Sequence, residues 1–94
     1  MEDLKPGQLV RSLAGRDKGQ YYFVIEVLDR RFVKLVDGKY KLIAKPKKKN
    51  TIHLQPLKCL SGEFIEQLKS GKLTDSRVAY LLKETGQAKL EREV

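Results

Sequence analysis

The side chains best suited to chemistry are cations that gather in two short segments. The first segment packs four lysines and an asparagine into six positions: Lys45, Lys47, Lys48, Lys49 and Asn50. Ammonium groups this close repel one another unless an anion relieves them, and phosphate oxygens can do so. The alternative is a loop of solvated lysines. Because a lysine acts as a point charge, a phosphate-binding cluster would add affinity more than sequence discrimination.

The second segment is a turn-rich stretch that places two glycines around charged residues. Gly15 and Gly19 permit a tight bend and let the backbone approach an oxyanion closely. Nearby cations could then hold phosphate oxygens without reading bases, although a plain hairpin loop with solvated charges is the alternative. The candidate residues of this segment are Arg11, Ser12, Gly15, Arg16, Lys18 and Gly19.

Catalytic and metal-binding chemistry have little support in this sequence. The sequence has one histidine, His53, and one cysteine, Cys59, so it contains no histidine or cysteine pair at ligand spacing, and no paired-carboxylate or phosphate-loop motif is present. We therefore expect a protein that is not an enzyme and uses no metal, cofactor or small-molecule substrate. His53 fits a hydrogen-bonding residue at a strand edge, with a nucleic-acid contact as the second interpretation.

The positive charge is confined to one part of the chain. Residues 1–60 contain all of the net charge of +8, whereas acids and bases balance in residues 61–94. Such asymmetry favours a localised surface for a polyanion, and RNA is the partner that we expect. No signal peptide or stretch long enough to span a bilayer is visible, and a lone cysteine suits a reducing compartment, so we expect a cytoplasmic protein without a membrane partner.

Alternating apolar residues predict the elements that carry these cations. Strands are expected over residues 8–13, 21–28 and 32–36. Asp37-Gly38 predicts a type I′ hairpin with a returning strand over 39–43, and a fifth strand is expected over 51–57, after a basic loop broken by Pro46. Five short strands suggest a small barrel that closes its own edges. Alternation should bury either Tyr21 or Tyr22, leaving the other, like Phe32 or Tyr40, as a platform for base stacking.

Two short helices are expected after the strands. Leu60, Phe64 and Leu68 are four residues apart and Gly71 follows as a stop signal. A second helix would begin at Thr74 or Asp75, bury Val78, Leu81 and Leu82 on one face, and end near Gly86. Residues 73–82 faintly resemble the first helix of a helix-turn-helix, but the second half is missing, which disfavours DNA binding. We therefore divide the chain into a barrel, residues 1–58, and a helical tail, residues 59–94.

The order of these features is similar to a known family. Residues 7–19, continuing through 22–25 and 32–38, resemble a KOW motif, and residues 47–57 resemble the end of the barrel in the archaeal and eukaryotic large-subunit ribosomal proteins of the fourteen-e type. The resemblance covers residues 5–57, while the short neutral tail is similar to short bacterial KOW proteins. It implies a mostly β protein: a five-stranded SH3-like KOW barrel, followed by two short helices, that binds ribosomal RNA through its glycine-containing loop. A module that binds proteins of the transcription or translation machinery is the alternative.

Overall fold

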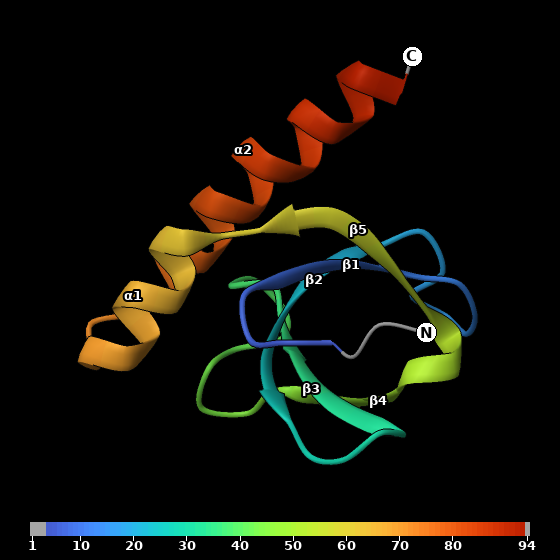
Figure 1. Ribbon diagram of the computed structural model, residues 1–94, viewed down its shortest axis with the longest axis horizontal. Coiled ribbons are helices and arrows are strands. Elements are labelled where there is room, and N and C mark those ends of the chain that lie inside the picture. Colours follow the sequence, from blue (N-terminus) through green and yellow to red (C-terminus); the bar gives the residue numbers. More distant parts are fainter. Residues whose placement is uncertain (1–3, 94) are drawn as a thin grey trace.

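Five antiparallel strands form one strongly curved sheet in the computed structural model, which describes residues 4–93 and their side chains up to Thr85 (Figure 1). The strand order is β4-β3-β2-β1-β5, and a single turn of 3-10 helix, η1 (Thr51–His53), carries the chain from β4 to β5. The predicted mostly β fold, with five strands followed by a helical tail, is confirmed. The strands are β1 (Gln8–Ser12), β2 (Tyr21–Val27), β3 (Phe32–Val36), β4 (Lys47–Asn50) and β5 (Leu54–Leu60).

The central strand β2 is buried on both of its faces. Tyr22 and Val24 point into the barrel, where they pack with Val10, Leu35 and other apolar residues. Phe23 points the opposite way, into a second cluster beneath the helices. Because successive side chains of a strand alternate between faces, this double burial explains why β2 is an almost unbroken apolar run.

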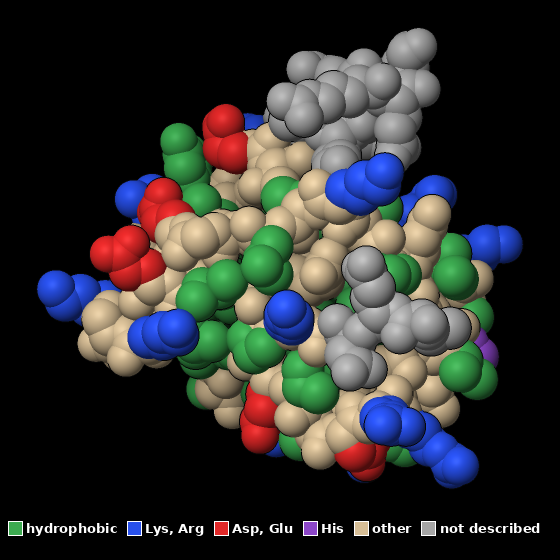
Figure 2. Space-filling model, in the orientation of Figure 1, with side chains coloured by type: hydrophobic (Ala, Val, Ile, Leu, Met, Phe, Trp, Pro, Cys, Tyr) green, Lys and Arg blue, Asp and Glu red, His purple; other side chains and the backbone are tan. Residues whose placement is uncertain are grey.

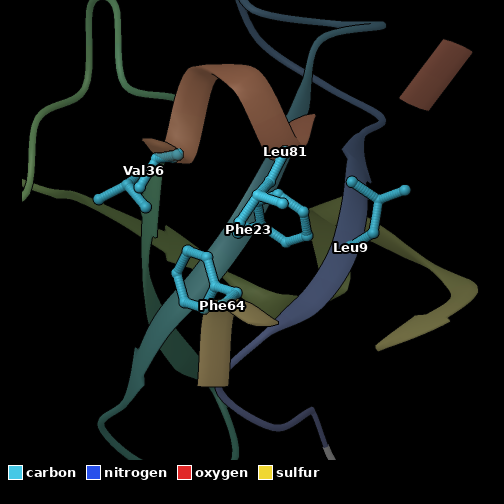
Figure 3. Close-up of a cluster of buried hydrophobic side chains, with 6 residues drawn as sticks. Leu9, Phe23, Val36, Phe64 and Leu81 are labelled. Carbon is cyan, nitrogen blue, oxygen red and sulfur yellow. The ribbon is translucent and has the colours of Figure 1, made fainter. Parts of the chain in front are cut away.

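The helices pack against the barrel and form part of the hydrophobic core. Phe64 of α1 (Gly62–Ser70), together with Val78 and Leu81 of α2 (Asp75–Glu93), packs against the outer face of the sheet (Figure 3). The partners from the sheet are Leu9, Phe23 and Val36. Strand β5 runs to Leu60, past the expected boundary at residue 58, and α1 follows almost at once.

Both helices begin at side-chain caps. The Ser61 hydroxyl accepts a hydrogen bond from the Phe64 N–H, and Gly71 ends α1 in the left-handed conformation with φ 73°, as predicted. The Thr74 hydroxyl accepts from the Arg77 N–H at the start of α2. The expected end of this helix near Gly86 is wrong, since the backbone stays helical to Glu93. A glycine in the interior of a helix lowers the stability of the helix by only about 1 kcal/mol relative to alanine, so Gly86 need not end α2.

The predicted returning strand over residues 39–43 is also wrong. The Asp37 carboxylate accepts hydrogen bonds from the backbone N–H groups of Lys39, Tyr40 and Lys41, which folds this segment into a side-chain-capped loop. Strand β4 takes the place beside β3, with Leu35 opposite Lys47 and Phe32 opposite Asn50. The lysine cluster therefore lies mostly on an edge strand and not in a loop.

Candidate nucleic-acid interface

One corner of the barrel brings the two basic segments together. The Leu13 N–H donates to the His53 carbonyl over 2.8 Å, and the Lys49 ammonium donates to the Ala14 carbonyl over 3.0 Å. The loop between β1 and β2 thus lies against β4 and η1, on the side of the barrel away from α1 (Figure 1). Helix α1 therefore does not cover this corner.

Asp17 is the residue at which the two segments meet. Its carboxylate oxygens lie 2.8 Å from the Lys47 ammonium and 3.0 Å from the Lys49 ammonium. They also accept hydrogen bonds of 2.9 Å from the hydroxyls of Ser12 and Tyr22. Because the Asp17 side chain is only 11% exposed, these contacts are shielded from water and stronger than ordinary surface ion pairs.

The surroundings of Asp17 fix its charge. Burial alone would raise the pKa of this carboxyl, but hydrogen bonds from Lys47, Lys49, Ser12 and Tyr22 outweigh burial and hold the pKa far below its usual range. Burial, followed by the hydrogen bond to Asp17, raises the pKa of the Tyr22 hydroxyl well above its ordinary value. At neutral pH the network therefore contains a carboxylate, a neutral phenol and two ammonium groups. The anion that the lysine cluster requires comes partly from within the chain.

Four of the candidate residues belong to this internal scaffold. Lys47 and Lys49 are held by Asp17, and Ser12 is 1% exposed with its hydroxyl directed to Asp17 and the Ala14 carbonyl. Asn50 caps η1 by accepting from the Ile52 N–H. Gly19 is half-buried, and Lys45 is exposed just before β4. The candidates exposed at or beside the corner are Arg11, Gly15, Arg16, Lys18, Lys48 and His53.

Two exposed arginines that are not among the candidate residues lie close to η1. Arg30 and Arg31 are exposed in the loop between β2 and β3, and their carbonyls accept from the hydroxyl and the N–H of Thr51 in η1 over 2.9 and 2.7 Å. Nearby, the Lys48 ammonium lies 4.6 Å from the centroid of the Phe32 ring. In the sequence, the signal for this part of the surface was a pair of adjacent arginines between two predicted strands. On the face in Figure 2, cationic side chains lie at the lower right and also elsewhere, including the helical side, where several acidic side chains lie as well.

The aromatic side chains are mostly structural. Tyr22 is 3% exposed and Phe23 is fully buried, so Tyr22 is the buried member of the tyrosine pair, while Tyr21 is half-buried. Tyr40 is 82% exposed, but it lies in the loop after β3. At this corner of the barrel the large exposed apolar side chains are Ile52 and Leu13, which are 71% and 45% exposed. The corner therefore offers mainly cations and backbone to a ligand.

The fold is a small five-stranded antiparallel sheet with two helices, and exposed cations lie at one corner of the sheet. No protein-family model matches this chain, and no curated protein matches it either. Among the described residues, no cluster of histidine, cysteine or carboxylate side chains could hold a metal ion. Within the same residues, no helix is both long and apolar enough to cross a membrane.

Proposed function

We propose that this protein binds structured RNA through the corner at which its two basic segments meet. The observation that carries the proposal is the joining of the loop between β1 and β2 to β4 through Asp17. Thr51, which follows β4, is hydrogen-bonded to the carbonyls of Arg30 and Arg31, so three segments with exposed cations are attached to one another. We name this surface the basic corner. Its members are Arg11, Arg16, Lys18, Arg30, Arg31 and Lys48.

The proposed mechanism is electrostatic capture of backbone phosphates. Each phosphate that a cation neutralises releases counterions and steepens the dependence of log affinity on log salt by about 0.7 to 0.9. Lys47 and Lys49 add less to this slope than two free cations would, because Asp17 offsets one of their two charges. Contacts of this kind position RNA without reading its sequence. The resemblance of residues 5–57 to ribosomal KOW barrels makes ribosomal RNA the partner that we propose.

The test is a charge-matched pair of triple variants. In the first variant, Arg16, Lys18 and Lys48 are replaced by alanine. In the second, the replaced residues are Lys69, Lys72 and Lys83, which are exposed at the helical side of the protein. Lys47 and Lys49 stay unchanged, since replacing them would disturb the loop as well as the charge.

Affinity for fragments of ribosomal RNA is then measured across a series of salt concentrations. The corner variant should show a salt slope that is shallower by about 2, with affinity reduced at least tenfold near 0.1 M salt. The helical variant should keep the slope of the unsubstituted protein. Equal losses in both variants would mean that net charge, and not the basic corner, governs binding.

Binding to a protein of the transcription or translation machinery is the second candidate. Ile52 and Leu13, which are 71% and 45% exposed, add apolar surface beside the cations, and such surface suits a protein partner. Purification from cells distinguishes the candidates. Complexes that survive nuclease and high salt would favour the protein partner, whereas complexes that collapse under either treatment would favour RNA.

A further inference from the structure

Asp17 is an acid in a place where an acid should weaken the binding of phosphate. It is the only Asp or Glu between residues 4 and 25, a stretch that contains the cations Arg11, Arg16 and Lys18. A carboxylate at the centre of such a surface repels RNA unless other groups of the protein offset its charge. The Asp17 carboxylate faces inward, where it contacts Lys47, Lys49, Ser12 and Tyr22.

These contacts attach the loop between β1 and β2 to strand β4, which the backbone hydrogen bonds within the loop do not do. Within the loop, the Gly19 N–H donates to the Ser12 carbonyl over 2.8 Å, and the Gln20 N–H donates to the Asp17 carbonyl over 2.9 Å. These bonds close the hairpin, but they do not attach it to β4. Apart from the bond from Lys49 to the Ala14 carbonyl, the side-chain attachments of the loop to β4 are the two bonds from Lys47 and Lys49 to Asp17.

The neighbours of Asp17 in sequence point the other way. Arg16 and Lys18 are exposed, while the carboxylate between them is almost fully covered. We propose that Asp17 is a positioning residue of the RNA interface, which fixes Arg16 and Lys18 against β4 so that the two cations meet one RNA strand together. This inference rests on the proposed function and goes beyond it, because it assigns an acidic residue to a phosphate-binding surface.

The sign of one substitution separates positioning from simple electrostatics. Asp17→Asn removes a negative charge and keeps the side-chain shape, so electrostatics alone predicts tighter RNA binding. Positioning predicts the opposite, a roughly three- to tenfold weaker affinity, which is the size expected when coupled neighbours are released. The charge-matched control is Glu66→Gln on the exposed side of α1, which should bind RNA as tightly as the unsubstituted protein or slightly more tightly.

A second variant avoids any change of charge and guards against a fold that fails. Tyr22→Phe removes the hydroxyl that donates to Asp17 but keeps the buried ring, and Tyr22 at 3% exposure cannot itself contact RNA. It should weaken binding in the same direction as Asp17→Asn, by roughly two- to threefold. All variants are measured by fluorescence anisotropy with a labelled ribosomal RNA hairpin, at a temperature where circular dichroism shows them folded.

A double-mutant cycle shows whether Asp17 acts through its neighbours. If it positions them, replacing Arg16 and Lys18 by alanine should cost much less affinity in the Asp17→Asn background than in the unsubstituted protein. Replacing Arg30 and Arg31, which lie on a different loop, should cost the same in both. Amide hydrogen exchange should be faster at Lys18 and Gly19 in Asp17→Asn, while the paired amides of β2 remain protected.

The outcomes separate this inference from the function on which it rests. If the unsubstituted protein binds no RNA, the proposed function fails and the inference fails with it. If it binds RNA and Asp17→Asn binds equally or more tightly, Asp17 is only a counter-charge and the inference alone is overturned. Equal costs of the Arg16 and Lys18 substitutions in both backgrounds would also overturn it.

Discussion

The rings of Phe23 and Phe64 pack with their centroids 4.9 Å apart and their planes tilted by 34°. Phe23 comes from the centre of the sheet and Phe64 from the first helix, so this contact joins the two parts of the molecule (Figure 3). Both side chains are fully buried. The helices therefore bury the outer face of the sheet, and we expect them to contribute to the stability of the barrel.

Phe64→Ala should lower the free energy of unfolding by about 3 to 5 kcal/mol, because it leaves a cavity beside Phe23 and exposes the outer face of the sheet. Urea unfolding measures the loss. Ile52→Ala is the control, since a side chain that is 71% exposed should change stability by less than about 0.5 kcal/mol. A Phe64 variant as stable as the Ile52 variant would show that the barrel folds without its helices.

Gly38→Ala should destabilise the protein by at least about 2 kcal/mol. Gly38 adopts φ 78°, and a Cβ at this position would overlap the Asp75 carbonyl and the Ala79 N–H of α2. Gly62→Ala is the matched control, because nothing lies within 4 Å of a Cβ there and the site is an exposed first turn of α1. Thermal unfolding should show a lower midpoint for Gly38→Ala and an unchanged or higher one for Gly62→Ala.

Lys49→Met should lower the free energy of unfolding by about 1 to 3 kcal/mol. The substitution keeps the length of the side chain, but it removes the ammonium that contacts Asp17 and the Ala14 carbonyl in a place only 11% exposed. Lys48→Met, on the same strand, removes an exposed charge above the Phe32 ring and should cost less than about 1 kcal/mol. Chemical denaturation compares them, and equal losses would contradict the buried network.

Acid should remove the stabilisation that Asp17 provides. Its pKa is lowered by folding, so this contribution is complete above the unfolded pKa of about 4 and is lost as pH falls toward the much lower folded pKa. The stability difference between the unsubstituted protein and Asp17→Asn should therefore shrink between about pH 5 and pH 2. Taking the difference cancels Asp29, whose pKa is also lowered, by backbone hydrogen bonds from Phe32 and Arg31. A difference that does not change with pH would contradict the network.

Base should remove the contribution of Tyr22. Folding raises the pKa of its hydroxyl, so the stabilisation is complete below the unfolded pKa of about 10 and is lost as pH rises through the folded pKa. The stability advantage over Tyr22→Phe should decline above about pH 10. Ultraviolet absorbance of tyrosinate should show one of the four tyrosines ionising later than the others. If this late ionisation is absent in Tyr22→Phe, it belongs to Tyr22.

The sequence predicts best where a segment's own residues decide its structure. Strand β3 falls where alternation predicts it, and Gly71 stops α1 because only a left-handed residue fits there. The segment after Asp37 was wrongly predicted because two local signals compete. Glycine favours a hairpin turn, but the Asp37 side chain captures three N–H groups and makes a loop.

The basic corner was harder to predict because it depends on partners distant in sequence. Lys47-Lys48-Lys49 has no apolar alternation, and it becomes a strand through β3 on one side and Asp17 on the other. Asp17 resembles any acid in a turn, and its contacts with Lys47 and Lys49 span 30 and 32 residues. The one available signal was a lone acid among cations. A localised surface for a polyanion was predicted, but the inward pairing of Lys47 and Lys49 with Asp17 was not.

The cluster that unites Leu9 with Leu81 also constrains how the chain can fold. These residues lie at nearly opposite ends of the sequence, so the N-terminal strands lack a covered outer face until the second helix has been synthesised. If the strands folded before α2 was synthesised, the outer face of the sheet would stay exposed to water. The molecule should instead assemble late and in one cooperative step, with no stable N-terminal intermediate.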